Sequence, residues 1–316
     1  MRCMMKTRNM LFAGAVFLSM LQPVGLIAAA NENSALGINI AGVTYWSAEI
    51  VFVDLFKHSQ TWKSQAQGKG YDQGGPLDLT SDGWVRSLRG DGHFADSIIL
   101  SKPKLGYPIG VYTCLYEGKG RIQFGDRMKV VDQTPGRIRV EVGPDVELLT
   151  LRITETDPAD PVRNIRFILP GFEDTYEEQP FHPEFLRRWE KFKVLRFMDL
   201  QRTNGSKQTN WSDRATPAMQ TQGDEAGVAI EYLIQLANAL DADPWFCMPH
   251  LATDDYVRNF AEMVKSGLKP GMKIYIEYSN ECWNGIFAQA RYCRDQGRKL
   301  GLSDNDYQAQ LRYCSR

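Results

Sequence analysis

The chain has 316 residues, of which 43% are hydrophobic and 24% charged, and its formal net charge is -1. These values are typical of a globular protein with one large domain or two ordinary ones. The even charge balance gives no reason to expect a nucleic acid or an anionic membrane surface as a partner. The aromatic share of 11% fits carbohydrate contacts and a large hydrophobic core equally well.

Residues 1–30 have the pattern of a secretory signal peptide. Three basic residues precede an apolar stretch at 10–20, and three alanines end at Ala30. This order predicts cleavage after Ala30 and a secreted or periplasmic protein. A transmembrane helix needs about 20 apolar residues. Because Gln22 and Pro23 interrupt the run, we expect no membrane span.

The five cysteines after the predicted cleavage site give no sign of a metal centre. An odd number in an exported protein leaves at least one cysteine without a disulfide partner. None forms a close pair of the metal-binding kind, and the chain has only four His. We therefore expect neither a structural zinc nor a cofactor. The cysteines are Cys114, Cys247, Cys282, Cys293 and Cys314.

The N-terminal half begins with a predicted buried strand at 36–44. Residues 52–56 form either a helical turn or a strand, and the Gly-, Gln-, Ser- and Asp-rich segment 63–83 is predicted to be a loop. From about 84 to 169, apolar residues recur with a period of two between turn-forming residues. Many short strands at regular spacing predict an antiparallel β-sandwich, which we assign to residues 73–171.

Strands and helices alternate after residue 171. Thr253 is the predicted N-cap of a helix that ends at Gly267. This alternation predicts a parallel sheet with right-handed crossovers. The predicted strands lie at 194–199, 245–249 and 274–279, and the predicted helices at 224–240, 253–267 and 286–300.

The pair Asn280-Glu281 closes the last predicted strand and is followed by Trp283. A Glu can act as general acid/base, an Asn can hold a sugar hydroxyl, and an indole can stack on a pyranose face. This motif therefore predicts one carboxylate of a sugar-cleaving site.

Alternation along the strand places Tyr275, Glu277, Ser279 and Glu281 on one face. Residues four apart in a strand are about 13 Å apart at ~3.3 Å per residue. The paired carboxyl groups of glycosidases are about 5–5.5 Å apart in retaining enzymes and about 6.5–9.5 Å apart in inverting ones. Glu277 is therefore not the partner of Glu281, and an ion pair with Arg196 suits it better.

The run from Tyr275 to Glu281 resembles the clan of retaining glycoside hydrolases built on (β/α)8 barrels. It is also similar to secreted bacterial proteins described as carbohydrate- or cellulose-binding. In the clan, an Asn-Glu pair ends the fourth barrel strand and its Glu is the acid/base. Here the pair ends the fourth strand counted from residue 36. The resemblance covers roughly residues 36–56 and 190–300.

The resemblance implies an α/β fold that is the N-terminal half of a (β/α)8 barrel with an inserted β-sandwich. Residues 31–72 hold the first barrel strand and the segment after it, and 172–316 hold βα units two to four. A complete barrel has eight strands and about 250 residues. The clan's nucleophilic Glu lies on the seventh strand, so we expect a fragment that is inactive alone. Its open sheet edge favours association.

The resemblance also implies roles for residues at other strand ends. Arg196 lies where the clan often places an Arg that supports the nucleophile; the alternative is a salt bridge with Asp199 or Glu277. His250 follows the third strand, where clan members often contact substrate; the alternative is a cap for the next helix.

Three tryptophans are candidate sugar platforms, and for each the alternative is packing in the core or at the rim. They are Trp46, Trp211 and Trp283.

Three functions fit these residues. The first is an exported glycoside hydrolase-like protein that acts on a poly- or oligosaccharide by retaining chemistry. The second is a carbohydrate-binding protein without catalysis. In the third, a structural protein, Asn280 and Glu281 only close a strand end. Carbohydrate is the expected partner under the first two.

Overall fold

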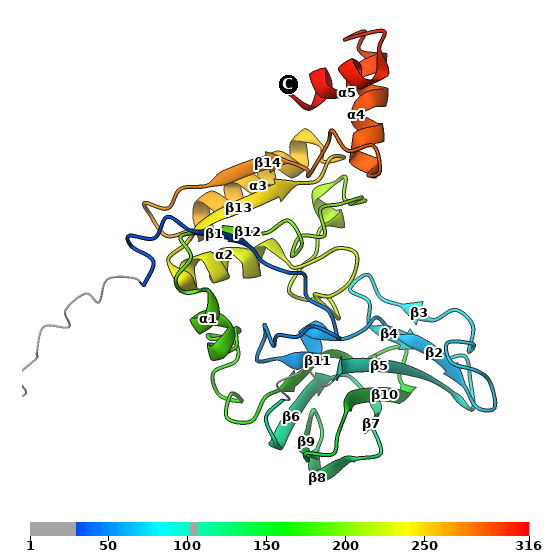
Figure 1. Ribbon diagram of the computed structural model, residues 1–316. Coiled ribbons are helices and arrows are strands. Elements are labelled where there is room, and N and C mark those ends of the chain that lie inside the picture. Colours follow the sequence, from blue (N-terminus) through cyan, green and yellow to red (C-terminus); the bar gives the residue numbers. More distant parts are fainter. Residues whose placement is uncertain (1–29, 102–106, 316) are drawn as a thin grey trace, which may run out of the picture.

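The computed structural model describes residues 30–101 and 107–315. The predicted signal peptide lies outside this part of the chain, except for Ala30. None of the helices in the described ranges has the length and hydropathy of a membrane-spanning helix. Figure 1 shows an α/β part with a parallel sheet and, beside it, a β domain.

A parallel four-stranded sheet organises the α/β part, and its spatial order β1-β12-β13-β14 follows the chain. In the register, Gly37 lies opposite Val194, and Trp245 lies opposite Tyr275. The predicted parallel sheet is therefore confirmed. The strands are β1 (Gly37–Asn39), β12 (Val194–Arg196), β13 (Asp243–Met248) and β14 (Tyr275–Tyr278).

Strand β14 is an outer strand of this sheet and carries exposed apolar side chains. Ile276 is 54% exposed, and Tyr275 and Tyr278 are also partly exposed. An outer strand offers unpaired backbone groups to another chain. Association through this edge stays a prediction.

Helices connect the strands of the parallel sheet. Thr253 caps α3 as predicted, because its side chain accepts a hydrogen bond from the Tyr256 amide. Helix α2 begins at residue 230 rather than 224, because the chain turns at Gly227, which has a φ of +76° and lies against the Leu200 carbonyl. The helices are α1 (Pro183–Trp189), α2 (Ile230–Leu240), α3 (Asp254–Gly267), α4 (Ala288–Lys299) and α5 (Asp306–Cys314), with 3-10 turns η1 (Leu55–His58) and η2 (Trp211–Asp213).

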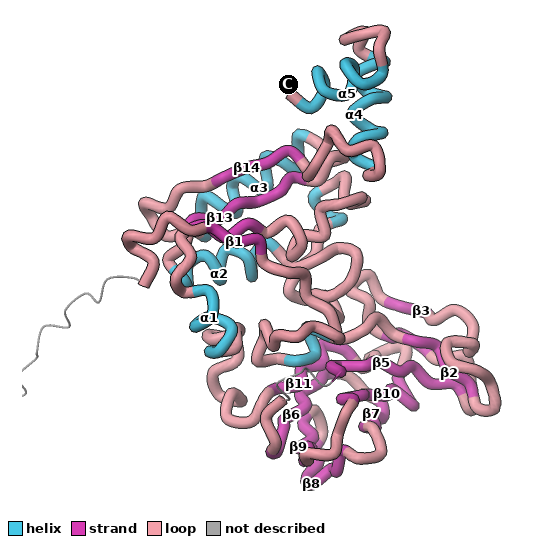
Figure 2. The backbone as a smooth tube through the Cα atoms, in the orientation of Figure 1, coloured by secondary structure: helices cyan, strands magenta, loops and turns pink. Residues whose placement is uncertain are grey.

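The β domain contains two four-stranded antiparallel sheets, β2-β5-β10-β7 and β11-β6-β9-β8, and the pair β3-β4. Side chains from both larger sheets share one hydrophobic core. Figure 2 shows the strands of this domain grouped below the parallel sheet. The predicted period of two is clear in β9, where Ile138, Val140 and Val142 are buried and the residues between them are exposed. The strands are β2 (Lys63–Ala66), β3 (Asp78–Leu79), β4 (Val85–Ser87), β5 (His93–Ser101), β6 (Gly110–Glu117), β7 (Gly120–Phe124), β8 (Met128–Thr134), β9 (Arg137–Val142), β10 (Leu148–Thr156) and β11 (Arg163–Ile168).

The predicted loop at 63–83 is wrong in part, because β2 pairs with β5 and β3 pairs with β4. Strand β2 has polar side chains, so it lacks the alternation of apolar and polar residues that predicts a strand. The buried Gln65 side chain has a partner, because it accepts from the Asp72 backbone amide (3.2 Å), and the Asp72 carboxylate in turn accepts from the Ser64 backbone amide (2.9 Å). The β domain thus includes residues before the expected boundary at 73.

The segment at 52–56 leads into the 3-10 turn η1 and links the two parts of the molecule. Phe52 belongs to the core of the α/β part, and Phe56 belongs to the core of the β domain. Between them, the Asp54 carboxylate accepts from the Phe56 amide (3.1 Å) and the Phe167 amide (2.8 Å). This short segment therefore packs into both cores and joins the β domain to the α/β part.

Candidate functional site

Arg196 is the centre of a polar network at the carboxyl end of the parallel sheet. Its guanidinium donates to Glu277 at 2.7 Å (Nη2 to Oε2) and 3.0 Å (Nε to Oε2). The two side chains are 21% and 26% exposed. The Cys247 thiol also donates to Glu277, at 3.4 Å, and burial raises the thiol's pKa to about 12. The predicted ion pair between Arg196 and Glu277 is confirmed.

Asp199, the other acid considered for Arg196, is joined to it only indirectly. The Asp199 carboxylate accepts from the Asn39 side-chain amide at 2.7 Å. The Asn39 oxygen in turn accepts from Arg196 at 3.5 Å. Asn39 in β1 therefore bridges the two groups.

The backbone changes direction where β14 ends, and the predicted alternation stops there. Ser279 and Glu281 have φ values of +57° and +42°, in the left-handed region that non-glycine residues rarely adopt. As a result, Asn280 reaches the network: its side-chain oxygen accepts from Arg196 at 2.8 Å. Ser279 is fully buried. The expectation that Ser279 and Glu281 continue the face of Glu277 is wrong, because a strand's alternation requires extended backbone.

Glu281 lies just beyond this network and is partly exposed. Its Oε2 accepts a hydrogen bond from the Asn284 side chain at 2.9 Å. The Asn284 amide also donates to the Glu281 carbonyl at 2.8 Å, which closes a turn. The carboxylate is thus held by a neutral amide and keeps access to solvent.

Asn204 connects the end of β14 to the loop that follows β12. Its side-chain oxygen accepts from Asn280 at 3.0 Å and from Gln289 at 2.7 Å. Gln289 also donates to the Asn280 carbonyl at 2.7 Å and is fully buried. Three residues therefore hold Asn280 in place: Arg196 and Asn204 bind its side chain, and Gln289 binds its backbone carbonyl.

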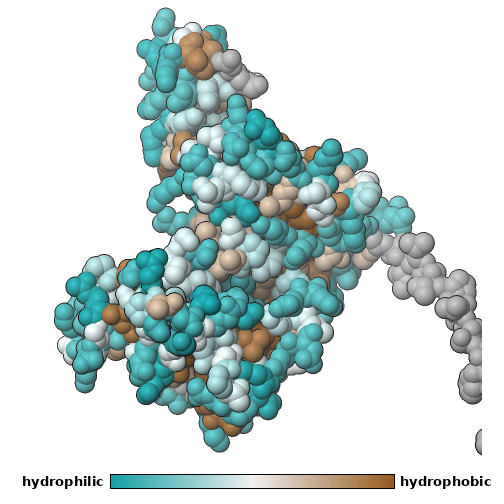
Figure 3. Space-filling model, turned by 180° about the vertical axis from the view of Figure 1, so that it is seen from behind, coloured by the Kyte–Doolittle hydropathy of each residue, from teal (hydrophilic) through white to brown (hydrophobic). Residues whose placement is uncertain are grey.

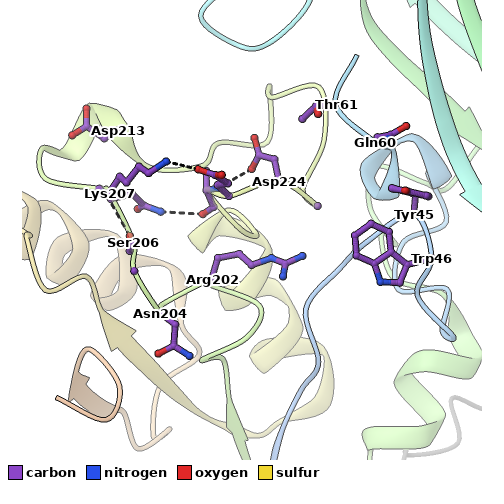
Figure 4. Close-up of a pocket in the computed structure, with 15 residues that line it drawn as sticks. Tyr45, Trp46, Gln60, Thr61, Arg202, Asn204, Ser206, Lys207, Asp213 and Asp224 are labelled. Atoms are coloured by element: carbon purple, nitrogen blue, oxygen red, sulfur yellow. Dashed lines mark hydrogen bonds and ion pairs between the residues drawn. The ribbon is translucent and has the colours of Figure 1, made fainter. Parts of the chain in front are cut away.

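Asn204 also lines a cavity of about 790 Å³ formed by the loops after β1 and β12 and by residues beside η1. Figure 4 shows Tyr45 and Trp46 on one side of this cavity and Arg202, Asn204 and Lys207 on the other. The Trp46 indole is well exposed, at 63%. Seen from behind, the surface is hollowed between the α/β part and the β domain (Figure 3).

Charged and amide groups cover the remaining cavity wall. Arg202 donates to the Val43 carbonyl at 3.0 Å, and Gln208 donates to the Ala226 carbonyl at 2.9 Å. Burial raises the pKa of Asp224. The wall therefore offers hydrogen-bond donors and acceptors around an exposed aromatic ring.

Of the predicted sugar platforms, Trp46 alone lines this cavity. Trp211 packs against Tyr256 at 5.3 Å between ring centroids, with the Arg214 guanidinium 4.5 Å from its ring. Trp283 lies on the turn after β14 and is 59% exposed. His250 is buried with its ring beside Tyr292, and burial lowers its pKa.

The cavity residues from the loop after β12 were missed in the sequence. This loop, residues 197–229, carries Arg202, Asn204, Gln208 and Asp224. A signal was present, because polar residues that follow a buried parallel strand lie at the sheet edge where α/β proteins bind ligands.

Comparison with family models, with curated proteins and with solved structures finds no match to this chain. What the structure defines is a mixed α/β protein, with a parallel four-stranded sheet, helices and a domain of antiparallel sheets.

Proposed function

We propose that this chain binds a poly- or oligosaccharide in the cavity beside Trp46. The observation that carries the proposal is an exposed indole that faces a polar wall across a cavity of about 790 Å³. Sugars combine an apolar ring face, which stacks on an aromatic ring, with hydroxyls that pair with amides and charged groups. The cavity also lies at the carboxyl ends of parallel strands, the usual ligand edge of α/β sheets.

A second proposal is retaining glycoside hydrolysis with Glu281 as acid/base. It is supported by the position of Glu281 at the carboxyl end of β14, next to an Asn280 whose side chain is fixed by Arg196 and Asn204. Glu277 is held in an ion pair by Arg196, so the nucleophile has to be another carboxylate. Retaining chemistry needs that group about 5–5.5 Å from Glu281.

For the fold, we propose that the parallel sheet belongs to a (β/α)8-type barrel. Four parallel strands that are neighbours in chain order support this, since barrel strands follow one another in that way. The β domain, in this proposal a β-sandwich, lies in the chain between β1 and β12 and is an insertion between the first and second βα units.

Trp46→Ala is expected to weaken sugar binding by at least about tenfold, because the stacking surface is lost. Isothermal titration against cellohexaose, xylohexaose and mannohexaose measures the change. Trp283→Ala is the matched control, since this tryptophan is similarly exposed but lies outside the cavity. Binding that falls equally in both variants, or no heat from any sugar in the unmutated chain, would contradict the proposal.

In a form of the protein that supplies the second carboxylate, Glu281→Gln is expected to lower the release of reducing sugar by about 100-fold, because the amide cannot donate or accept the proton. Sugar affinity should stay the same, since the amide keeps the shape of the side chain. Glu178→Gln, at an exposed position in the segment before α1, serves as the control. Undiminished hydrolysis by Glu281→Gln rules out its role as acid/base and leaves the binding function standing.

A further inference from the structure

Three cysteines that are far apart in the sequence meet at one point. The sulfur atoms of Cys282, Cys293 and Cys314 all lie within 4.8 Å of one another. They come from the turn after β14, from α4 and from the last residue of α5. All three are free thiols. The expectation that the cysteines form no metal-type group rested on sequence spacing, and the return of α5 along α4 brings the three together.

The spacing of the sulfurs suits a shared metal ion. A zinc–sulfur bond is about 2.3 Å long, so two tetrahedral thiolate ligands lie about 3.8 Å apart. Three sulfurs that are all within 4.8 Å need only small side-chain shifts to reach this geometry. A disulfide joins two sulfurs at about 2.05 Å and leaves the third thiol unused.

The cluster is shielded from solvent on most sides. Cys293 is fully buried and Cys282 is 7% exposed, whereas Cys314 is partly exposed. The Cys314 Sγ lies 3.6 Å from the Cys282 carbonyl, to which its thiol donates. Cysteine binds a metal as the thiolate, so each sulfur gives up its proton when the ion binds.

The surrounding side chains hold the cluster in place. The buried Gln310 side chain donates to the Cys282 carbonyl at 2.7 Å. Aromatic rings pack beside it, with Tyr313 lying 6.5 Å from Tyr278 and 6.0 Å from Tyr292 between centroids. Figure 1 shows α4 and α5 standing out from the parallel sheet as a hairpin. The cluster lies where this hairpin joins the sheet.

We propose that Cys282, Cys293 and Cys314 bind one thiophilic d10 metal ion, Zn²⁺ or Cu⁺. Thiolates favour both ions. Binding replaces the three thiol protons by metal–sulfur bonds and releases those protons to solvent. Within the described residues the group contains no fourth His, Cys, Asp or Glu, so Zn²⁺ takes water as its fourth ligand, whereas Cu⁺ is held by the three sulfurs.

The metal ties the α4–α5 hairpin to the turn that carries Glu281, since Cys282 is the next residue. The site does not depend on the carbohydrate proposal, because its three ligands lie outside the cavity beside Trp46.

The test is metal loading of the full chain, reduced and kept without oxygen, with either ZnSO₄ or a Cu⁺ complex. After removal of free metal, elemental analysis is expected to find one ion per chain, and the ion retained in competition between the two is the preferred one. Cys293→Ser is expected to weaken binding at least about 100-fold, because a ligand is lost. Cys114→Ser, a buried cysteine of the β domain, should bind as the unmutated chain does.

Cys314→Ser is the second variant, since its partly exposed position at the end of α5 makes misfolding a small risk. Near-UV circular dichroism verifies that both variants fold. Equal metal content in the unmutated chain and in both variants means adventitious binding and overturns the proposal. A reduced chain that takes up neither ion also overturns the proposal. This holds even if two of the three cysteines form a disulfide when the chain is later exposed to air.

Discussion

Arg196→Met is expected to lower the free energy of unfolding by about 2–3 kcal/mol, since it removes one partner of a largely buried ion pair. The guanidinium makes hydrogen bonds of 2.7 Å and 2.8 Å to Glu277 and Asn280. Methionine fills much of the same volume but leaves the Glu277 carboxylate, three-quarters buried, without a cation. Urea denaturation followed by tryptophan fluorescence measures the loss.

The matched control for Arg196 is Lys207→Met. This lysine pairs with Glu225 at 2.8 Å, but the two side chains are 84% and 86% exposed. An exposed pair contributes little to stability, because water and salt screen both charges. Adding Glu277→Gln to Arg196→Met should restore part of the lost stability, because the unpaired charge disappears. Equal small losses in Arg196→Met and Lys207→Met would show that the buried pair does not stabilise the sheet.

Lowering the pH from 6.5 to 4 is expected to destabilise the protein by about 3 kcal/mol through His58 alone. His58 is fully buried, and burial lowers its pKa to about 4. Its Nε2 accepts hydrogen bonds from the Val51 and Phe52 amides at 3.1 Å and 3.2 Å, so this nitrogen has no room for a proton. Between pH 6.5 and 4 the unfolded chain binds this proton and the folded chain does not. Stability therefore falls as the pH falls through this window.

Denaturation of the unmutated chain and of His58→Gln, at a series of pH values from 4 to 7, isolates the contribution of His58. Burial raises the pKa of nearby Asp54, which opposes the effect of His58, but both proteins contain Asp54 and its contribution cancels in the difference. His93→Gln, at a partly exposed position in β5, is the control and should keep the acid sensitivity. If His58→Gln retains the same pH dependence, His58 is not its source.

The order of elements could be predicted where hydrophobic periodicity was strong. The alternation from residue 194 onward predicted the parallel sheet, and Thr253 predicted the start of α3. Strand β2 was missed because its polar side chains are buried with hydrogen-bond partners, which composition does not reveal. Helices α1 and α5 were missed because seven or nine residues hold little periodic signal.

The candidate site could be predicted only in part. The pairing of Arg196 with Glu277 followed from side-chain alternation on β14, but the reach of Asn280 into the same network did not. That contact depends on the positive φ at Ser279, which the alternation of side chains along a strand does not predict. The position of Arg202 and Asn204 after a strand was a signal that they lie at the sheet edge, but the path of the long irregular loop that brings them to the cavity beside Trp46 could not be predicted.

The left-handed residues on both sides of Asn280 have a consequence for affinity. Each such backbone conformation costs about 1–2 kcal/mol in a residue other than glycine, and the folded protein adopts both of them around Asn280. The direction of the Asn280 amide is thus established before any ligand arrives, and Arg196 and Asn204 maintain it. Asn280 itself is only 4% exposed, so the group that this fixed backbone preorganises is the adjacent, partly exposed Glu281, which loses little conformational entropy in the proposed sugar contact.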